Sequence, residues 1–228
     1  MKDNVLNPQI LKIDCPDCYL WLTDASEIDE EKFPIFLARL NEDNIGRYNN
    51  FLRKERQKQF LVGRILLKQA VSSFLAIPEN EIDIIECPGN KPRLSLRRKT
   101  ARLPFFSISH SGKWIGCAIG KNAIGLDIEI HDPARETITS GEMAFNVQEN
   151  EWLKFRPEKE RDKSFYQLWT QKEALYKLLS KTENEKNIWQ TENVFHEQYA
   201  WHLKTMDQGN LSLAICGFRK NCGKTRDD

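Results

Sequence analysis

Two long segments with helical periodicity, one in each half of the chain, constrain its fold most strongly. In residues 51–75, apolar side chains recur every three or four positions, and Pro78 follows the end of the segment. Residues 161–180 form the second such segment. Shorter segments with the pattern of strands surround both, at residues 17–22, 82–86, 105–109, 114–119, 124–130, 199–203 and 211–216. The sequence therefore predicts an α+β fold.

The order of these segments also predicts how the chain divides. Each half supplies a long helix and several antiparallel strands, so we expect two similar lobes that form a pseudo-dimer. Because no low-complexity linker separates the halves, we expect them to pack directly against each other, with the junction near residues 121–123. The predicted N-terminal lobe is 1–121, the predicted C-terminal lobe is 122–220, and residues 221–228 are predicted to be a polar tail.

Composition excludes several classes of protein. The chain has 228 residues, 40% of them hydrophobic, and no run approaches the roughly 18–20 apolar residues of a membrane span, which excludes an integral membrane protein. The N-terminal residues interrupt their apolar stretches with Asp, Pro and Lys, so they lack the continuous apolar region of a secretory signal. We therefore predict a cytoplasmic protein.

The six cysteines are too few for a disulfide scaffold, and we expect reduced thiols. Cys15 and Cys18 form the only C-x-x-C pair. A structural zinc ion would need two further ligands, for which Cys216 and Cys222 are the remaining closely spaced pair. A thioredoxin-like redox site would need a βαβ pattern around Cys15 and Cys18, which is absent. We expect buried or idle thiols.

Charge is balanced overall but segregated along the chain, with 34 Lys and Arg against 33 Asp and Glu. Residues 87–126 contain eight bases and no acid, and residues 47–68 contain seven bases and one acid, Glu55. Residues 127–151 contain seven carboxylates and one base, Arg135. Two basic tracts favour a polyanionic ligand, and the neighbouring carboxylates favour a divalent cation. The alternative is that each tract is a solvated face.

The strand at residues 124–130 carries a pair of acids, Asp127 and Glu129. Residues two apart on a strand share a face, so both carboxylates point the same way while the alternate apolar residues enter the core. Adjacent carboxylates repel each other unless a cation or a shared proton intervenes, and Mg²⁺ favours such oxygen ligands. Many edge strands also alternate apolar and acidic residues, so the pair alone is a weak signal.

Two further stretches carry residues suited to phosphate chemistry. Glu173 and Lys177 are four residues apart in the second long helix, so they share a helical face, either as a surface ion pair or as a metal ligand and a phosphate-binding cation. Ser109 and His110 lie in a strand that ends in hydroxyl groups and a Gly turn. Such groups can donate neutral or cationic hydrogen bonds to a phosphate, or can simply satisfy the turn.

Four motifs in this order resemble the signature of the 4′-phosphopantetheinyl transferases, in the larger single-chain class with two lobes. They are Lys-Pro at residues 91–92, Ser-Ile-Ser-His-Ser-Gly at 107–112, Ile-Gly-Leu-Asp-Ile-Glu at 124–129 and Trp-Thr-Gln-Lys-Glu-Ala-Leu-Tyr-Lys at 169–177. The resemblance runs from about residue 51 to residue 177. It implies that Asp127, Glu129 and Glu173 hold Mg²⁺, although hard oxygen ligands suit Mn²⁺ as well.

The resemblance also implies contacts with coenzyme A. Lys177 would contact the pyrophosphate, and Arg47 would contact the 3′-phosphate. The nucleotide end of coenzyme A would be lined by Lys91, Ser109 and His110. Two departures from the family pattern affect this region. The usual Gly-x-Gly loop after the last Lys is replaced by residues 178–184, and Gln59 replaces a base, so nucleotide contacts are expected to shift to Arg56, Lys58 or Arg64.

The implied reaction is attack by a serine hydroxyl of an apo carrier protein, acyl or peptidyl, on the pantetheine-side phosphorus of coenzyme A. Holo-carrier and adenosine 3′,5′-bisphosphate are the products. Glu173, directly or through a water molecule, is the expected acceptor of the serine proton, and Lys177 the expected stabiliser of phosphate charge. A monomer is expected because both lobes lie on one chain. The pathway of the carrier is not specified by the sequence.

Three alternatives remain open at the level of sequence. A nucleic-acid-binding module would explain the two basic tracts, but the three carboxylates would repel a phosphate backbone, which argues against nucleic acid. A metal-dependent phosphohydrolase would also use the three carboxylates, and would release phosphate or nucleotide without a protein acceptor. A homologue that binds coenzyme A without turnover would explain the altered residues 178–184.

Overall fold

The computed structural model describes residues 6–13, 18–98, 102–180, 188–206 and 209–219. The first half of the chain forms a four-stranded antiparallel sheet in the order β1-β2-β6-β5 and a separate hairpin, β3-β4. The strands are β1 (Gln9–Lys12), β2 (Cys18–Asp24), β3 (Ile82–Ile85), β4 (Arg93–Leu96), β5 (Phe105–Ser111) and β6 (Trp114–Gly120). The second half forms a three-stranded antiparallel sheet in the order β7-β9-β8, from β7 (Ile124–Ile130), β8 (Tyr199–Met206) and β9 (Leu211–Phe218).

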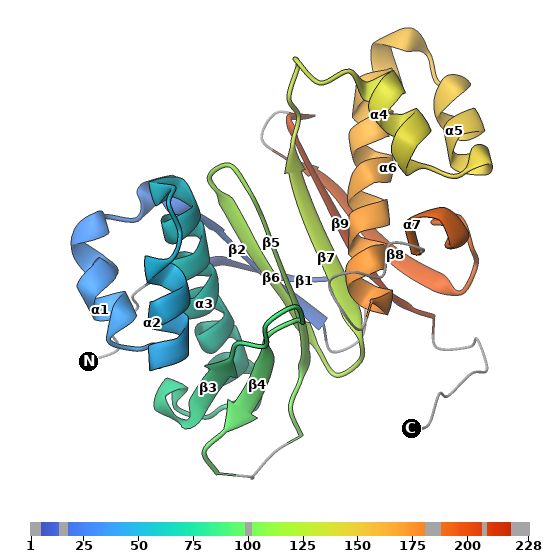
Figure 1. Ribbon diagram of the computed structural model, residues 1–228. Helices are drawn as coiled ribbons and strands as arrows, with labels where there is room; N and C mark the ends of the chain where they lie inside the picture. Colours follow the sequence, from blue (N-terminus) through green and yellow to red (C-terminus); the bar gives the residue numbers. More distant parts are fainter. Residues whose placement is uncertain (1–5, 14–17, 99–101, 181–187, 207–208, 220–228) are drawn as a thin grey trace.

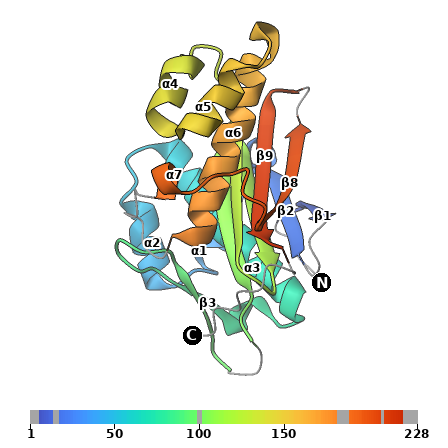
Figure 2. The same ribbon diagram turned by 90° about the vertical axis from the view of Figure 1, so that its right-hand side faces the viewer.

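One long helix packs on each sheet (Figure 1). Helix α3 (Lys54–Leu75) covers the first sheet, and helix α6 (Glu158–Leu179) covers β7 and β9, as the side view in Figure 2 shows. The remaining helices are short: α1 (Phe33–Leu37), α2 (Glu42–Asn49), α4 (Thr137–Ala144), α5 (Val147–Lys154), α7 (Ile188–Thr191) and the single turns Ala25–Glu27, Glu30–Lys32 and Glu79–Glu81. No described helix combines the length and the apolar character needed to cross a membrane.

Helix α3 follows from its sequence. Its buried face is apolar, with Leu61, Ile65 and Leu66 all 0% exposed. It ends at Ala76, whose φ of 54° is left-handed, and Pro78 cannot continue a helix. The sequence expectation of a helix at 51–75 is confirmed from Lys54 onward. The second predicted helix begins three residues earlier than expected, directly after Pro157, because proline is favoured at the start of a helix.

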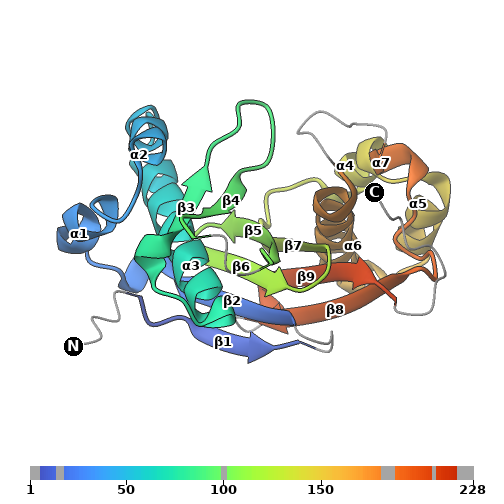
Figure 3. The same cartoon turned by 90° about the horizontal axis from the view of Figure 1, so that it is seen from below.

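The two sheets meet edge to edge. Strand β5, the outer strand of the first sheet, lies beside β7, the outer strand of the second. Figure 3 shows both sheets between the two long helices, with α3 on the side of the first sheet and α6 on the side of the second. A core shared by the halves fills the junction, and its members include Leu20, Leu22, Leu126, Ile128 and Leu213. The direct packing of the two halves is therefore confirmed.

The mixed helix-and-sheet class predicted from the sequence is confirmed, and every predicted strand is present. The sequence reading missed β1, β4 and all the short helices. These elements have three to eight residues, too few to show a clear period. Cys18 and Cys216 are buried, as expected for structural thiols, while Cys15 and Cys222 lie outside the described residues, as do the polar tail and residues 181–184 of the altered family loop.

Candidate active site

A cleft of about 890 Å³ lies between the two halves of the molecule. Its charged lining residues are all bases, within the described part of the chain: Arg47, Arg56, Arg64, Lys91, Arg93 and Lys177. Arg47, Arg56 and Arg64 come from the first basic tract, and Lys91 and Arg93 come from the second. Aromatic and aliphatic side chains line the rest, among them Phe60, Phe105 and Tyr176. The two tracts therefore converge on one cavity, which suits an elongated anionic ligand with an apolar part.

Lys177, which lines this cleft, forms an ion pair with the buried Asp127 behind it. The Lys177 amine lies 2.7 Å from Asp127 Oδ1 and 3.0 Å from the Ser109 hydroxyl oxygen. The Ser109 hydroxyl donates to the same Oδ1 at 2.8 Å. Asp127 is 3% exposed, and its second oxygen, Oδ2, is buried without a hydrogen-bond partner. This ion pair joins β7 to α6. The partner of Lys177 is therefore Asp127, and not Glu173 as in the expected surface ion pair.

Glu173 lies one helical turn before Lys177 and is half-buried. Burial raises the pKa of Glu173 to about 7, the positive charge of Lys177 opposes that rise, and the negative charges of Asp127 and Glu129 add to it. Burial and the charge of Asp127 also raise the pKa of Glu129. The three carboxylates therefore act on one another, and Glu173 can take up or release a proton near neutral pH.

These carboxylates have the donor chemistry that a hard divalent cation requires. The described residues contain no group of three or more His, Cys, Asp or Glu side chains already arranged to hold a metal ion, and Asp127 Oδ1 is engaged by Lys177. Asp127 Oδ2, however, is an unpaired buried oxygen, and the neighbouring acids repel it. A cation would relieve both penalties, so the residues present fit Mg²⁺ or Mn²⁺.

His110 lines the cleft as a neutral imidazole. Burial, followed by the positive charges of Arg56 and Lys177, lowers the pKa of His110 to about 4. The Arg56 Nη1 atom lies 3.3 and 3.2 Å from the two ring nitrogens of His110. The sequence reading allowed a cationic donor here. In the structure the positive charge belongs to Arg56, and His110 contributes a neutral ring.

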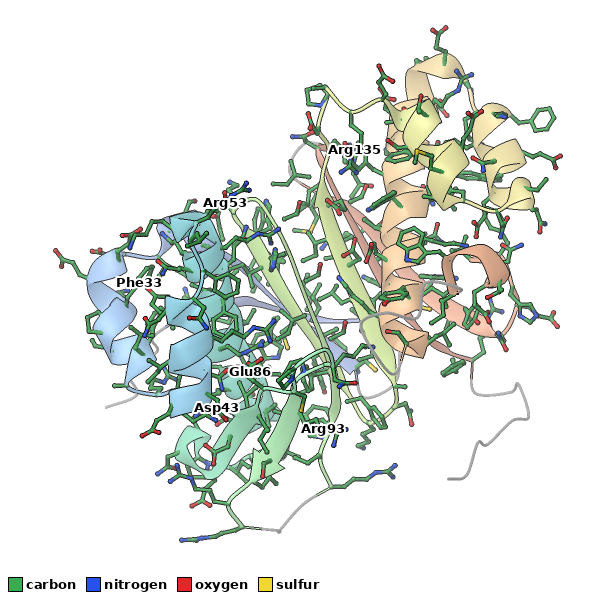
Figure 4. All side chains as sticks on the ribbon, in the orientation of Figure 1. Phe33, Asp43, Arg53, Glu86, Arg93 and Arg135 are labelled. Carbon is green, nitrogen blue, oxygen red and sulfur yellow. The ribbon has the colours of Figure 1, made fainter. Side chains whose placement is uncertain are left out.

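Arg47 and Lys91, two further predicted coenzyme contacts, line the cleft but already have partners. Arg47 pairs with Glu86, which also pairs with Arg64 at 2.7 Å. The guanidinium carbons of Arg47 and Arg64 lie 5.6 and 4.5 Å from the centroid of the Phe60 ring. Glu86 follows β3, near α2 (Figure 4).

Lys91 connects the two halves at the end of α6. Its amine donates to the backbone carbonyls of Lys177 and Ser180, the latter at 2.9 Å. Cations are stabilised at a helix C-terminus, where the carbonyls have no partners in the helix.

Of the three bases to which nucleotide contacts are expected to shift, Arg56 and Arg64 line the cleft and Lys58 does not. The Lys58 amine instead donates to the Ile28 carbonyl at 2.9 Å and lies 5.8 Å from the Phe33 ring centroid. Gln59 reaches the Gly112 carbonyl at 2.9 Å. Sequence reasoning missed Glu86. Its partners Arg47 and Arg64 are distant in the chain, so no pattern in the neighbouring residues indicates that it lies between them.

Family models match both halves of the chain. The model described as 4′-phosphopantetheinyl transferase, N-terminal, matches residues 27–121, and the model described as the 4′-phosphopantetheinyl transferase superfamily matches residues 123–220. Together they leave only the termini and one junction residue unmatched. The two matches cover every residue that the sequence analysis placed in the site.

Individual proteins match more distantly. The chain is similar to the 4′-phosphopantetheinyl transferase HetI of Nostoc sp., 27% identical over 75% of this chain and 71% of HetI. It is similar to the transferase gsp of Aneurinibacillus migulanus, 26% identical over 71% of this chain and 65% of gsp. It is also similar to the transferase Sfp of Bacillus subtilis, 28% identical over 67% of this chain and 64% of Sfp. The chain spans about two thirds of the length of these relatives, and with both family models matched, it belongs to the 4′-phosphopantetheinyl transferase superfamily.

Proposed function

We propose that the protein transfers the 4′-phosphopantetheine group of coenzyme A to a serine hydroxyl of an apo carrier protein. The observation that carries this proposal is the 890 Å³ cleft, whose charged lining residues in the described chain are all bases, one of which, Lys177, pairs with Asp127 behind it. Coenzyme A combines a pyrophosphate and a 3′-phosphate with a largely uncharged pantetheine arm. A cleft that is basic in one part and apolar in another suits a ligand of that chemistry.

The basic side chains would neutralise the phosphates of coenzyme A. Arg56 and Arg64 come from α3, and Arg47 comes from the neighbouring α2. Lys91 and His110 would complete the contacts to the nucleotide end, as the family resemblance implies. Ser109, the third residue that the resemblance implies there, is not among the lining residues, and its hydroxyl is occupied by Asp127, Ile128 and Lys177. Glu86 holds Arg47 and Arg64 in place before the ligand binds, which lowers the entropy cost of ordering them.

Asp127, Glu129 and Glu173 would hold Mg²⁺, and Mn²⁺ would suit the same oxygens. The bound ion would neutralise charge on the pyrophosphate. The orphaned Asp127 Oδ2 supports this assignment, as does the raised pKa of Glu173.

In the proposed reaction, the carrier serine oxygen forms a bond to the pantetheine-side phosphorus. The bond between that phosphorus and the bridging pyrophosphate oxygen breaks, and its electron pair leaves with adenosine 3′,5′-bisphosphate. Glu173, directly or through a water molecule, accepts the serine proton. Lys177 stabilises the charge that develops on the bridging oxygen.

We further propose that residues 1–121 and 122–220 are related lobes of a pseudo-dimer, and that the protein is a cytoplasmic monomer. Each half places one 22-residue helix, α3 or α6, on its own antiparallel sheet. The boundary between the two family matches supports the division. Acyl and peptidyl carriers are the proposed partners, serving fatty-acid, polyketide or nonribosomal-peptide synthesis.

Intact-mass spectrometry of several apo carrier proteins, incubated with the protein, coenzyme A and Mg²⁺, tests the function. We expect the carrier to gain one phosphopantetheine mass, and Glu173→Ala to abolish the gain. Coenzyme A binding without any mass gain would indicate a homologue without turnover. Release of nucleotide without a modified carrier would indicate a phosphohydrolase, and salt-sensitive oligonucleotide binding without coenzyme A binding would indicate a nucleic-acid module.

A further inference from the structure

Three serine hydroxyls of β5 connect the two sheets. Ser107, Ser109 and Ser111 alternate along β5, so their side chains share one face, and that face meets β7. Each hydroxyl oxygen accepts a backbone N–H of β7: Leu126 N at 3.0 Å, Ile128 N at 3.3 Å and Ile130 N at 3.0 Å, respectively. The matching order of donors and acceptors shows that β5 and β7 run in the same direction.

This serine ladder replaces ordinary strand pairing at the junction. The other edge of β7 pairs with β9, so the N–H groups facing β5 would otherwise lack partners. Buried N–H groups without partners cost about 1–3 kcal/mol each. The hydroxyls satisfy them and fix the position of β7 against the strand that carries His110.

Two of the three hydroxyls have a second bond, to a carboxylate. The Ser109 hydroxyl donates to Asp127 Oδ1 at 2.8 Å, and the Ser111 hydroxyl donates to Glu129 Oε2 at 3.2 Å. Ser109 also accepts from Lys177, so its one proton and both lone pairs are used. No carboxylate bond is found for Ser107 among the described residues. Ser107 is therefore a control for Ser109 and Ser111, because it makes the same bond to β7 without a bond to a carboxylate.

We propose that Ser109 and Ser111 are positioning residues that orient Asp127 and Glu129 for a divalent cation. This inference rests on the proposed function. A hydroxyl anchored by a backbone N–H has its remaining proton directed at the carboxylate, so the carboxylate keeps one orientation despite the like charge beside it. Outer partners of this kind typically raise metal affinity 10- to 100-fold.

The inference can be tested by Mn²⁺ binding to the full-length protein, measured by calorimetry without coenzyme A or carrier. Ser109→Ala and Ser111→Ala should each weaken Mn²⁺ binding at least 10-fold. Ser107→Ala should leave the affinity within about twofold, although it breaks the same kind of junction bond. Ser111→Thr keeps the hydroxyl and should keep the affinity. Thermal unfolding should show that all four variants are folded.

The outcomes separate this inference from the proposed function. If the unchanged protein neither binds Mn²⁺ nor modifies a carrier, the proposed function is wrong, and the inference is overturned with it. If the unchanged protein binds Mn²⁺ while Ser109→Ala and Ser111→Ala bind it as tightly as Ser107→Ala, only the inference is overturned. Equal weakening by all three substitutions would likewise assign the ladder to junction packing alone.

Hydrogen exchange provides a second measurement that does not depend on a metal. The amides of Leu126, Ile128 and Ile130 should exchange slowly in the unchanged protein. Each Ser→Ala substitution should accelerate the exchange of its own partner amide at least 10-fold. Unchanged exchange in all three variants would overturn the ladder itself.

Discussion

The basic wall, whose side chains line the cleft, and the acidic wall, the carboxylates Asp127, Glu129 and Glu173 that lie behind Lys177 and do not themselves line it, differ in how their charges are compensated. On the basic wall, Glu86 pairs with both Arg47 and Arg64, and two helix carbonyls receive the Lys91 amine. On the acidic wall, Lys177 acts on Asp127 and Glu173, Arg135 acts on Glu129, and Asp127 Oδ2 has no partner. Carboxylate and carbonyl partners hold these basic side chains before a ligand arrives, whereas on the acidic wall three carboxylates share two cations. A cation is therefore expected on the acidic wall before an anionic substrate can be accommodated there.

The acidic wall depends first on the close approach of α6 to β7, which Gly125 allows. A Cβ at this position would lie 1.9 Å from the Ala174 carbonyl oxygen, a backbone atom that cannot rotate away. Gly125→Ala should destabilise the protein by more than about 3 kcal/mol, or prevent folding, because α6 must move. Urea unfolding would measure the change.

Gly46 provides the matched control on the basic side. It lies in α2, and a Cβ there would meet no atom within 4 Å. Gly46→Ala should raise stability by up to about 1 kcal/mol, as expected for a helix interior. Similar behaviour of the two variants would contradict the tight packing at β7.

Removal of one carboxylate should eliminate turnover while leaving the fold intact. Asp127→Ala and Glu173→Ala should each lower carrier modification at least about 100-fold, because the site would lose charge stabilisation in the transition state. The control is Glu158→Ala, an exposed acid at the other end of α6. Full activity in either site variant, measured by intact mass, would refute the assignment of the acidic wall.

The basic wall should lose stability when its internal counterion is removed. Glu86→Gln leaves the buried Arg64 guanidinium with a neutral partner, and we expect a loss of about 2 kcal/mol in urea unfolding. Adenosine 3′,5′-bisphosphate should restore more stability to this variant than to the unchanged protein, since its phosphates replace the missing charge.

Asp83→Asn is the control for Glu86→Gln, because the Asp83–Arg97 pair is longer, at 3.3 Å, and its side chains are 32% and 64% exposed. It should cost less than about 1 kcal/mol. An equal loss in both variants would show that Glu86 compensates no buried charge.

The sequence predicts those features of the site that depend on local periodicity. Alternation along residues 124–130 places Asp127 and Glu129 on one face, and the four-residue spacing places Glu173 and Lys177 one turn apart. The same periodicity predicts α3 and α6, because each has about twenty residues over which to repeat. The pairing of Lys177 with Asp127, 50 residues away in the chain, requires the sheet and the helix to be packed first.

Helix α5 shows both limits of such prediction. Asn146 and Glu149 form a capping box, a start signal that is present in the sequence and was overlooked. Glu149 also forms a fully buried ion pair with Lys172 of α6, at 2.8 Å, which no local pattern indicates. The Lys of the Lys-Glu motif therefore fixes α5 against α6, while the adjacent Glu173 belongs to the site.

The smallest expected effect is a dependence of stability on pH, which Glu173 of the acidic wall should cause. Burial and neighbouring acids raise the pKa of Glu173 from about 4.5 to about 7 in the folded protein, so the folded state holds a proton that the unfolded state has lost. Glu173 therefore reduces the free energy of unfolding progressively as the pH rises through this interval. Glu173→Gln removes that penalty and should be more stable than the unchanged protein at pH 8, by about 1–2 kcal/mol, but not at pH 4.

Added metal should reduce the difference in stability between the unchanged protein and Glu173→Gln at pH 8. Mn²⁺ added at pH 8 should stabilise the unchanged protein, because it binds the folded carboxylates, and should stabilise Glu173→Gln much less. Thermal unfolding at pH 4 and pH 8, with and without Mn²⁺, measures both effects. If Glu173→Gln were no more stable than the unchanged protein at pH 8 without metal, the acidic wall would carry no uncompensated charge. The two walls would then differ in the arrangement of their side chains but not in how well their charges are compensated.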